Sequence, residues 1–235
     1  MKVLAIDVGG SHVKCLASGQ SEPRAFVSGP ALTAAAMVKG VLALTRDWRY
    51  QAVSIGYPGP VLHGAPLREP HNLGAGWVGF DYSRAFGRPV KVVNDAAMQA
   101  LGSYQGGRML FLGLGTGLGS ALIVDGKLEA MELAHLPYRK GRSYEDYVGA
   151  HGLERLGRKK WRKAVFDVIE ELNAALAPDY VVLGGGNVRR MKALPEYARR
   201  GDNGNAFLGG FRLWDEAGVR APRSPAGATR AGRRK

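Results

Sequence analysis

Cysteine, acidic residues and long hydrophobic runs are all scarce in this chain of 235 residues. The single cysteine, Cys15, excludes an internal disulfide framework and any zinc site built from several cysteines of one chain. No stretch reaches eighteen uninterrupted apolar residues, so we expect no membrane-spanning helix. The first residues place one lysine before a short apolar run that soon meets an acid, which is not typical of a signal peptide. We therefore expect a cytoplasmic protein.

The shortage of acids leaves a large positive charge that is confined to two segments. Lysine and arginine number 33 against 20 acids, an excess of 13. Residues 139–163 hold nine basic and three acidic residues, and residues 217–235 hold six basic residues and no acid. The second segment has the composition of a disordered basic tail. The first contains a cluster that fits either a track for a polyanion or a solvated helix face: Arg155, Arg158, Lys159, Lys160, Arg162 and Lys163.

Glycine, in contrast, is abundant, with 34 residues or roughly twice the usual share. Three glycine-containing turns follow apolar runs: Asp7 to Ser11, Gly113 to Gly119, and Gly184 to Asn187. Exposed backbone N–H groups in such turns form anion-binding concavities, and missing Cβ atoms let phosphate oxygens approach. One such turn would be weak evidence of a phosphate site, because most glycine turns have no ligand. None of them matches the dinucleotide-binding or P-loop pattern.

The order of predicted elements is duplicated along the chain, which indicates an α/β protein with two lobes. The first half reads as strands 2–6, 12–17, 24–27, 52–55 and 90–93 with helices 31–48, 81–86 and 96–104. The second half reads as strands 109–114, 119–124, one after the turn 125–126, and 179–183, with helices 143–156, 160–176 and 206–216. We predict lobes at residues 1–106 and 107–216, with the last helix able to return to the first lobe.

Two acids stand at the ends of predicted strands. Asp7 lies beside the first glycine turn, where it fits either water-mediated Mg²⁺ binding or an Asx turn. Asp95 follows Asn94 at a strand-to-helix junction, where an acid is most often an N-cap. A carboxylate that faces a cleft between lobes there could also accept the proton of a substrate hydroxyl during phosphoryl transfer.

Three further polar residues fit the binding of a polyhydroxylated ligand. Glu132 and His135 are three residues apart, so a helical segment would place them on one face. A lone histidine is usually structural, and zinc lacks cysteine partners here. Asn72, in the loop before Trp77, could add a hydrogen bond, whereas Trp77 itself is more simply a core anchor.

These motifs together resemble the sugar-kinase branch of the ROK family, within the actin/hexokinase-like superfamily. That superfamily has a ribonuclease H-like, two-lobed α/β fold with a cleft between the lobes. The resemblance runs through most of residues 2–216 and rests on ordered motifs: Asp7 to Lys14, Gly56 to Gly59, Asn72 to Trp77, Val93 to Ala96, Gly113 to Ser120, Glu132 to His135, and Val182 to Gly186. Within the family, the chain is similar to the polyphosphate glucokinases at Gly115 to Leu122, Ser143 to Tyr147 and Pro178 to Gly186.

The resemblance implies roles for named residues. Asp95 would be the catalytic base, and Asp7 would support Mg²⁺. The sugar would be bound by Asn72, Asn94, Glu132, His135 and Glu145. The phosphates would be bound by Gly9, Gly10, Ser11, Lys14, Gly115, Thr116, Gly117 and Gly119, with Gly184, Gly185 and Gly186 on the nucleotide side. No structural zinc is expected, because residues 136–142 lack the family's cysteine-rich motif.

The implied reaction is transfer of a terminal phosphoryl group from polyphosphate, ATP or both to the 6-hydroxyl of glucose, by an enzyme that is a homodimer. One alternative is an ATP-dependent kinase for another hexose, such as mannose, fructose or an amino sugar. The other is a non-catalytic sugar-binding regulator, since the family also contains repressors. We expect no nucleic-acid partner, because six residues before the first glycine loop leave no room for a helix-turn-helix and the tail has no aromatic residue.

Overall fold

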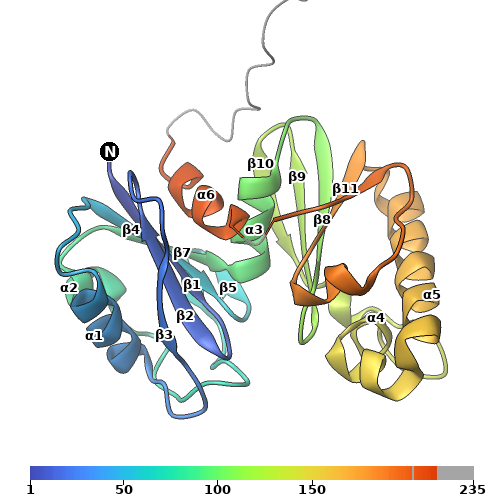
Figure 1. The fold of residues 1–235 in the computed structure, drawn as a ribbon, viewed down its shortest axis with the longest axis horizontal. Coiled ribbons are helices and arrows are strands. Elements are labelled where there is room, and N and C mark those ends of the chain that lie inside the picture. The colour runs from blue at the N-terminus through green and yellow to red at the C-terminus, as the bar shows by residue number, and fades with distance from the viewer. Residues whose placement is uncertain (203, 216–235) are drawn as a thin grey trace, which may run out of the picture.

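The computed structural model describes residues 1–202 and 204–215, so the predicted tail at 217–235 lies outside the described part. Two five-stranded sheets stand side by side, with helices on their outer faces and a pair of helices between them (Figure 1). The layers run helices, sheet, helices, sheet, helices. This mixed α/β architecture has the predicted order of elements in its two sheets.

The first sheet has the strand order β3-β2-β1-β4-β7. Its strands β1 (Val3–Val8), β2 (His12–Ala17) and β3 (Arg24–Val27) form an antiparallel meander, and β4 (Ala52–Tyr57) and β7 (Val90–Asn94) extend it in parallel with β1. Helices α1 (Ala34–Leu44) and α2 (Tyr82–Phe86) cover the outer face, where every second residue of β2 is buried as alternation predicts. A short hairpin, β5 (Val61–Leu62) and β6 (Ala65–Pro66), follows β4.

The second sheet repeats this plan with the order β10-β9-β8-β11-β12. It consists of β8 (Arg108–Leu114), β9 (Leu118–Val124), β10 (Lys127–Met131), β11 (Tyr180–Gly184) and β12 (Ala198–Arg200). Its outer face is covered by α4 (Tyr144–Val148) and α5 (Ala150–Leu176), with the 3₁₀ turns η1 (Leu133–His135) and η2 (Gly186–Arg190) at the same end. Both sheets therefore have an antiparallel meander followed by two parallel strands.

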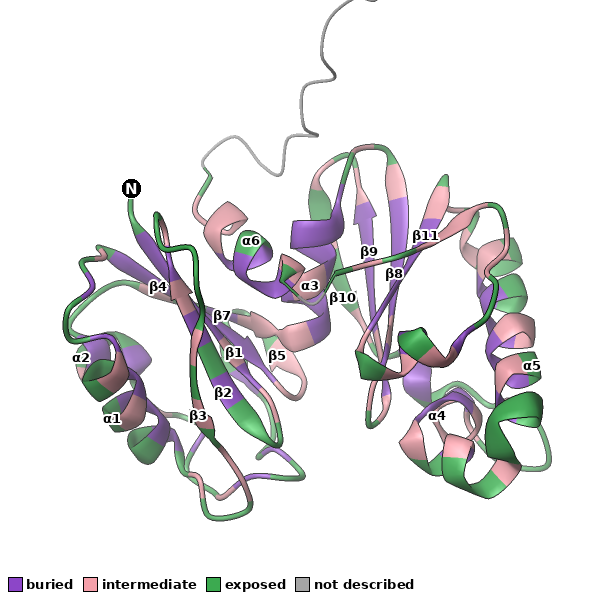
Figure 2. Cartoon of the chain, viewed as in Figure 1, coloured by how far each residue is buried: buried purple, intermediate pink, exposed green. Residues whose placement is uncertain are grey.

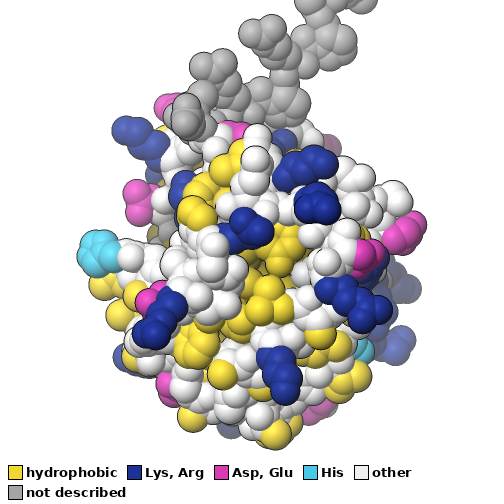
Figure 3. Space-filling view, turned by 90° about the vertical axis from the view of Figure 1, so that its left-hand side faces the viewer, with side chains coloured by type: hydrophobic (Ala, Val, Ile, Leu, Met, Phe, Trp, Pro, Cys, Tyr) yellow, Lys and Arg dark blue, Asp and Glu magenta, His cyan; other side chains and the backbone are white. Residues whose placement is uncertain are grey.

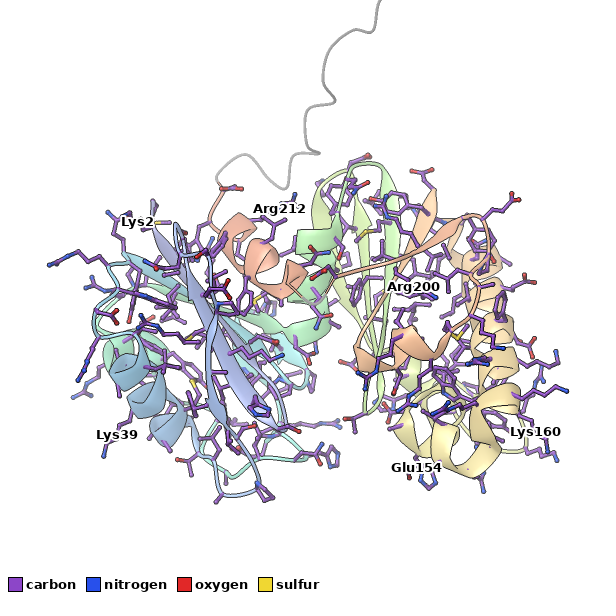
Figure 4. The ribbon with its side chains drawn as sticks, in the orientation of Figure 1. Lys2, Lys39, Glu154, Lys160, Arg200 and Arg212 are labelled. Atoms are coloured by element: carbon purple, nitrogen blue, oxygen red, sulfur yellow. The ribbon has the colours of Figure 1, made fainter. Side chains whose placement is uncertain are left out.

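Two helices fill the space between the sheets. Helix α3 (Asp95–Ser103) packs on the second sheet, and α6 (Asn205–Arg212) packs on β1 and β4 of the first. The helices touch each other at glycines: a Cβ at Gly209 would overlap the carbonyl oxygen of Met98, and one at Gly102 would overlap that of Asn205. Arg212, labelled in Figure 4, donates to the carbonyl oxygen of Leu101 at 2.6 Å. The last helix of the described chain thus ties α3 to the first sheet.

Burial follows this layering (Figure 2). The central strands of each sheet and most of α3 are buried, while exposed and buried residues alternate along α1 and α5, which each have one face on a sheet. Trp77 and Trp161 are among the largest fully buried side chains, one in each outer core. No helix in the described ranges is long and apolar enough to span a membrane.

Two predicted helices differ from the structure, and one strand of the second sheet was not predicted. The predicted helix 143–156 is split at Gly149, whose backbone is extended and lies against the carbonyl oxygen of Thr116, so a continuous helix is excluded there. The predicted helix 206–216 ends at Arg212. Strand β12 was not predicted, because its residues Ala198–Arg200 carry two arginines and no apolar alternation.

Candidate functional site

The carboxyl edge of the first sheet brings the two strand-end acids together. In the register of the parallel strands, Asp7 pairs with Gly56, and Gly56 pairs with Val93. Asp95, which begins α3 directly after β7, therefore lies at the same edge as Asp7, with β4 between their two strands. On the other side of β1, Asp7 pairs with Lys14 of β2. Ligands of open α/β sheets bind outside this edge, at the carboxyl ends of the parallel strands.

The start of α3 fixes the two adjacent polar residues differently. The Asn94 side chain caps the helix by accepting a hydrogen bond from the Ala97 N–H at 3.1 Å, and its amide nitrogen donates to the Gly59 carbonyl oxygen at 3.0 Å. Asn94 thereby ties the loop after β4 to the helix. One oxygen of the Asp95 carboxylate accepts from the Ala96 N–H at 2.7 Å, and its side chain makes no other protein hydrogen bond among the described residues.

The electrostatic setting of Asp95 favours the protonated form of its carboxyl group. Burial, together with the negative charges of Asp7 and Glu132, raises its pKa to about 7, although hydrogen bonding from the Ala96 N–H acts in the opposite direction. Burial also raises the pKa of Asp7, against the opposing effect of the Lys14 ammonium. A carboxyl group with a pKa near neutrality is suited to exchange a proton at physiological pH.

The first glycine turn is a tight loop between β1 and β2. The Gly9 N–H donates to the His12 carbonyl oxygen at 3.0 Å, and the Ser28 hydroxyl donates to the Gly9 carbonyl oxygen at 2.6 Å. Within the described ranges, the N–H groups of Gly10 and Ser11 have no acceptor. Both residues are exposed, so these N–H groups are available to an anion.

Glycines also line the matching edge of the second sheet. Gly113 of β8 pairs with Gly119 of β9 on one side and with Gly184 of β11 on the other. A Cβ at Gly119 would be 2.6 Å from the Cβ of Ala96, so only glycine lets β9 pack this closely on the start of α3. The glycine edge of the second sheet therefore lies directly beside Asp95.

The second glycine loop, residues 115–117, has its carbonyl groups bonded inward. The Gly115 carbonyl oxygen accepts from the Asn187 side chain at 2.9 Å, and the Thr116 carbonyl oxygen accepts from the Ala150 N–H at 2.9 Å. The N–H groups of Thr116 and Gly117 have no acceptor in the part of the chain that the structure describes. This loop presents donors and hides acceptors, which suits phosphate binding.

Glu145 contacts this same loop. One oxygen of its carboxylate accepts from the Leu118 N–H at 3.2 Å, and there is no space for a side chain at Gly117 because the Glu145 carboxylate occupies it. Helix α4 holds Glu145 in place through a capping box at Ser143 and Asp146. The structure thus places this predicted sugar ligand against the second glycine loop.

Glu132 and His135 lie on one face of the η1 turn, as their spacing predicts. The distance between the Glu132 Oε2 and the His135 Nε2 is 4.0 Å, and both side chains are exposed. Ala134, between the two polar residues, is buried and is not in the left-handed region of backbone conformation. Alanine is therefore accommodated without backbone strain between the two polar residues.

Asn72 is exposed in the loop before Trp77 and lies against the first glycine turn, because a Cβ at Gly10 would be 3.5 Å from the Asn72 Cβ. A residue without a recognisable sequence motif, Glu69, shapes this loop. The Glu69 carboxylate accepts from the Trp77 N–H at 3.0 Å and from the Val78 N–H at 3.2 Å. No motif marked Glu69, since its partners are backbone groups.

The predicted nucleotide-side loop packs on the second glycine loop. Gly185 has a left-handed backbone (φ 84°), and a Cβ there would be 2.5 Å from the Leu114 carbonyl oxygen. Gly184 packs closely against Phe111, and Gly186 faces open space. Asn187, a bridge to the Gly115 carbonyl oxygen, was given no role in the sequence, because an asparagine after three glycines is first read as a turn residue.

One acid is suitably placed for a divalent cation that is bound together with phosphate. Among the described residues, no group of three or more histidine, cysteine, aspartate and glutamate side chains could hold a metal ion. Mg²⁺ keeps several water ligands and is usually bound by one or two carboxylates together with substrate phosphates. Asp7, next to the free N–H groups of the first glycine turn, fits that mode of binding.

Comparison with known proteins identifies the family to which this site belongs. The model of the ROK family matches residues 3–130, which include Asp7, Asn72 and the start of α3 with Asp95. The chain belongs to the ROK family. The match covers the whole first sheet and the meander of the second, so the family's pattern extends across both glycine loops.

Individual ROK proteins resemble the chain over most of its length. The polyphosphate glucokinase of Mycobacterium tuberculosis is 29% identical over 208 residues, covering 79% of this chain and 77% of its own. The structure of the inorganic polyphosphate/ATP-glucomannokinase from Arthrobacter sp. strain KM has a TM-score of 0.76 at 24% identity, covering 89% and 96% of the two chains. A ROK glucokinase from Streptomyces griseus, solved with glucose and AMPPNP, has a TM-score of 0.70 at 16% identity, covering 91% and 99%. These solved structures share the actin/hexokinase-like fold of this chain.

Proposed function

We propose that the chain is a sugar kinase that transfers the terminal phosphoryl group of polyphosphate, ATP or both to the 6-hydroxyl of glucose, with Asp95 as general base. The observation that supports this most directly is the setting of Asp95. Its carboxyl group has a pKa of about 7 and lies beside the glycine edge of the second sheet, through the contact of Gly119 with Ala96. An acceptor hydroxyl and a phosphoryl donor could meet at this point.

Phosphoryl transfer asks for positioning and charge stabilisation more than for covalent chemistry. The free N–H groups of Gly10, Ser11, Thr116 and Gly117 would bind phosphate oxygens from two sides. Asp95 would orient the sugar hydroxyl and take its proton as the oxygen attacks phosphorus. Movement of the two sheets towards each other would exclude water and so limit hydrolysis of the donor.

The sugar would lie against the first sheet and the η1 turn. Glu132 and His135 are exposed on one face and offer an acceptor and a donor to neighbouring hydroxyls. Asn72 would reach the sugar from the loop held by Glu69, and Asn94 would contribute while it caps α3. Glu145, bonded to the Leu118 N–H, would link the bound sugar to the phosphate loop. The names of the mycobacterial and Streptomyces relatives support glucose as the acceptor.

Mg²⁺ would be held by Asp7, with water and donor phosphates completing its coordination. When bound, it would neutralise negative charge on the transferred group. The chain's own cations would supplement this, since Lys14 pairs with Asp7 across β1 and β2 and its side chain is exposed. Lys14 would therefore attract the donor while opposing the rise that burial causes in the pKa of Asp7.

A substrate panel tests the proposed function. Glucose, mannose, fructose and N-acetylated hexosamines would each be offered with ATP and with long-chain polyphosphate, and product would be measured by phosphate-ester chromatography. We expect glucose 6-phosphate as the main product and polyphosphate to give the higher kcat/KM. A preference for another hexose would contradict glucose as the acceptor, and a preference for ATP would contradict polyphosphate as the preferred donor. Absence of any product, with sugar binding retained, would contradict the kinase assignment and favour a sugar-binding regulator.

The pH dependence of turnover tests the role of Asp95. Only the ionised carboxylate can accept a proton, and its pKa of about 7 lies far above the ordinary value near 4. We expect kcat/KM for glucose to fall about tenfold for each pH unit below 7 and to level off above it. The measurement is a rate profile from pH 5 to 9 with long-chain polyphosphate, whose inner phosphates stay ionised throughout. A rate that stays flat down to pH 5 would exclude Asp95 as the base.

A further inference from the structure

A pocket of about 310 Å³ lies on the second lobe between α5 and η2, and its lining is made of arginine. Its four lining residues come from two segments that are about thirty residues apart in the sequence: Arg158, Arg162, Arg189 and Arg190. Both segments lie at the outer end of the molecule, on the side of the second sheet (Figure 1). Four like charges around one cavity repel each other, so such an arrangement is costly unless an anion enters.

A break in α5 creates one wall of this pocket. Gly157 has a non-helical, left-handed backbone (φ 70°, ψ 162°), so a second helical segment begins at Arg158. Arg158 and Arg162 are four residues apart and therefore lie on one face of that segment, at its positive end. Arg189 and Arg190 face them from the last turn of η2.

The guanidinium groups of the pocket have no counter-ion in the described residues. No carboxylate lies within 4 Å of any of the four, whereas neighbouring cations such as Arg139 and Lys163 pair with Asp167. Only Nε atoms are used internally: that of Arg162 donates to the Arg190 carbonyl oxygen at 2.5 Å, and that of Arg190 donates to the Asn187 side chain at 3.2 Å. The terminal nitrogens are left as free, fork-shaped donors, which match phosphate oxygens.

Hydrogen bonds connect this pocket to the second glycine loop. Asn187 donates to the Gly115 carbonyl oxygen and accepts from Arg190, and the Arg190 carbonyl oxygen in turn accepts from Arg162. The relay is continuous from the loop to the helix α5. The pocket is therefore linked to the loop through two residues, Asn187 and Arg190.

We propose that the four-arginine pocket binds the part of a linear polyphosphate that extends beyond the phosphoryl group being transferred. This rests on the proposed function and specifies where its donor lies. The lining offers cations and no aromatic or acidic side chain, so it suits a line of phosphates better than a neutral purine base. Binding of such a dense line of phosphate charge releases condensed counter-ions, which favours association at low salt and makes the affinity salt-dependent.

The surrounding basic residues do not form one track, contrary to one interpretation of the sequence cluster. Arg155 stacks over the Tyr147 ring and donates to the Asp146 carbonyl oxygen, and Lys163 pairs with Asp167. Lys160 lies on the outer side of α5 (Figure 4). At the opposite end of the molecule, over α1 and α2, lysines and arginines are scattered between exposed hydrophobic side chains (Figure 3). The pocket, in contrast, gathers four arginines around one cavity.

The test replaces the two pocket arginines that make no internal hydrogen bond. Arg158→Gln and Arg189→Gln would be combined in the full chain, because both side chains are exposed and neither makes a side-chain hydrogen bond or ion pair in the described part. The control is Arg46→Gln with Arg84→Gln, which makes the same charge change at exposed positions of the first lobe. Residues 216–235 stay in every variant, so their contribution to anion binding cancels.

Binding of long-chain polyphosphate, inorganic tripolyphosphate, ATP and single-stranded RNA would be measured by calorimetry at several salt concentrations. We expect the Kd for long-chain polyphosphate to rise about tenfold in the pocket variant, and the slope of log K against log salt to shrink by roughly 1.4, the equivalent of two phosphate contacts. Tripolyphosphate should lose less affinity, and the control variant should match the wild type.

An unchanged Kd for long-chain polyphosphate in the pocket variant would overturn the proposal. An equal loss of affinity for ATP would also overturn it, because the pocket would then be a nucleotide site. A loss of affinity confined to RNA would overturn it as well. These readouts need no turnover. If the wild type phosphorylates no sugar but the pocket variant loses polyphosphate affinity, the kinase assignment fails while the pocket assignment holds. If the wild type phosphorylates sugar with polyphosphate but the pocket variant binds polyphosphate normally, the pocket assignment fails while the kinase assignment holds.

Discussion

Replacing Asp95 by asparagine is expected to lower kcat by about a thousandfold while leaving the Kd for glucose within a few-fold of its wild-type value. Asparagine keeps the shape of the side chain and its oxygen can still accept from the Ala96 N–H, so α3 should begin as before. It cannot take a proton. The measurement is a steady-state assay with the donor and sugar that the panel identifies, together with glucose titration by calorimetry.

The same substitution should stabilise the folded protein at alkaline pH. The folded-state pKa of Asp95, about 7, exceeds the ordinary value, so the folded protein binds this proton more tightly than the unfolded chain. The free energy of unfolding therefore falls as the pH rises from about 4 towards 7. Asparagine does not ionise, so the variant does not lose this stability. We expect a gain of about 1–3 kcal/mol in the free energy of unfolding at pH 8 and little gain near pH 4.

Asp81→Asn is the matched control for both effects. Asp81 also stands at a helix start, where its carboxylate accepts from the Arg84 N–H at 2.9 Å, but it is exposed and lies on α2. Asparagine caps a helix about as well as aspartate, so kcat and stability should hardly change. Retention of more than a tenth of wild-type turnover by the Asp95 variant would remove that carboxylate from the proposed role.

Gly209→Ala is expected to destabilise the protein by about 3 kcal/mol, which corresponds to a fall in Tm of roughly 6–12 °C for a chain of this size. The added Cβ would overlap the Met98 carbonyl oxygen and lie 2.9 Å from the Gly102 backbone nitrogen, so α6 must move away from α3. Helix propensity works in the other direction, since alanine favours a helix by about 1 kcal/mol over glycine. The steric overlap should outweigh this gain, because the atoms that the Cβ would overlap belong to the backbone and cannot move aside as a flexible side chain could.

Gly186→Ala controls for the change in residue type. A Cβ at Gly186 meets nothing within 4 Å and the backbone is not left-handed, so its Tm should stay close to the wild-type value. Thermal unfolding followed by circular dichroism measures both variants. If Gly209→Ala melts as high as the control, α3 and α6 are not held at the separation described here.

Most of the fold could be predicted from the sequence because its central strands are short apolar runs bounded by turn residues. The predicted strand 52–55, for example, is fully buried in the structure, and the turn at Asp125–Gly126 joins two paired strands. The split at Gly149 could not be predicted, because it depends on the Thr116 carbonyl oxygen, which is distant in the sequence. Strand β12 is short and basic, and it forms because the edge of β11 is free to pair with it.

Candidate site residues could be predicted where the same residue both marks the end of a strand or a turn and carries a group that can bind a ligand. Asp7 and Asp95 mark strand ends, and the glycine turns mark loops with free N–H groups. Residues that act through tertiary contacts gave no signal: Glu69 bonds backbone groups eight and nine residues away, and Asn187 bonds Gly115. The roles of the named residues, Mg²⁺, the division into lobes, the homodimer and the cytoplasmic location stay predictions.

The repeated strand order gives each position of one sheet a counterpart in the other. By register, Asp7 corresponds to Gly113, Lys14 to Gly119, and Gly56 to Gly184. The cross-strand pair Asp7 and Lys14 of the first sheet thus corresponds to the cross-strand pair of glycines Gly113 and Gly119 in the second. If one half arose as a copy of the other, the two copies have diverged at these positions: the first has ionisable side chains near its strand ends, and the second has bare backbone there.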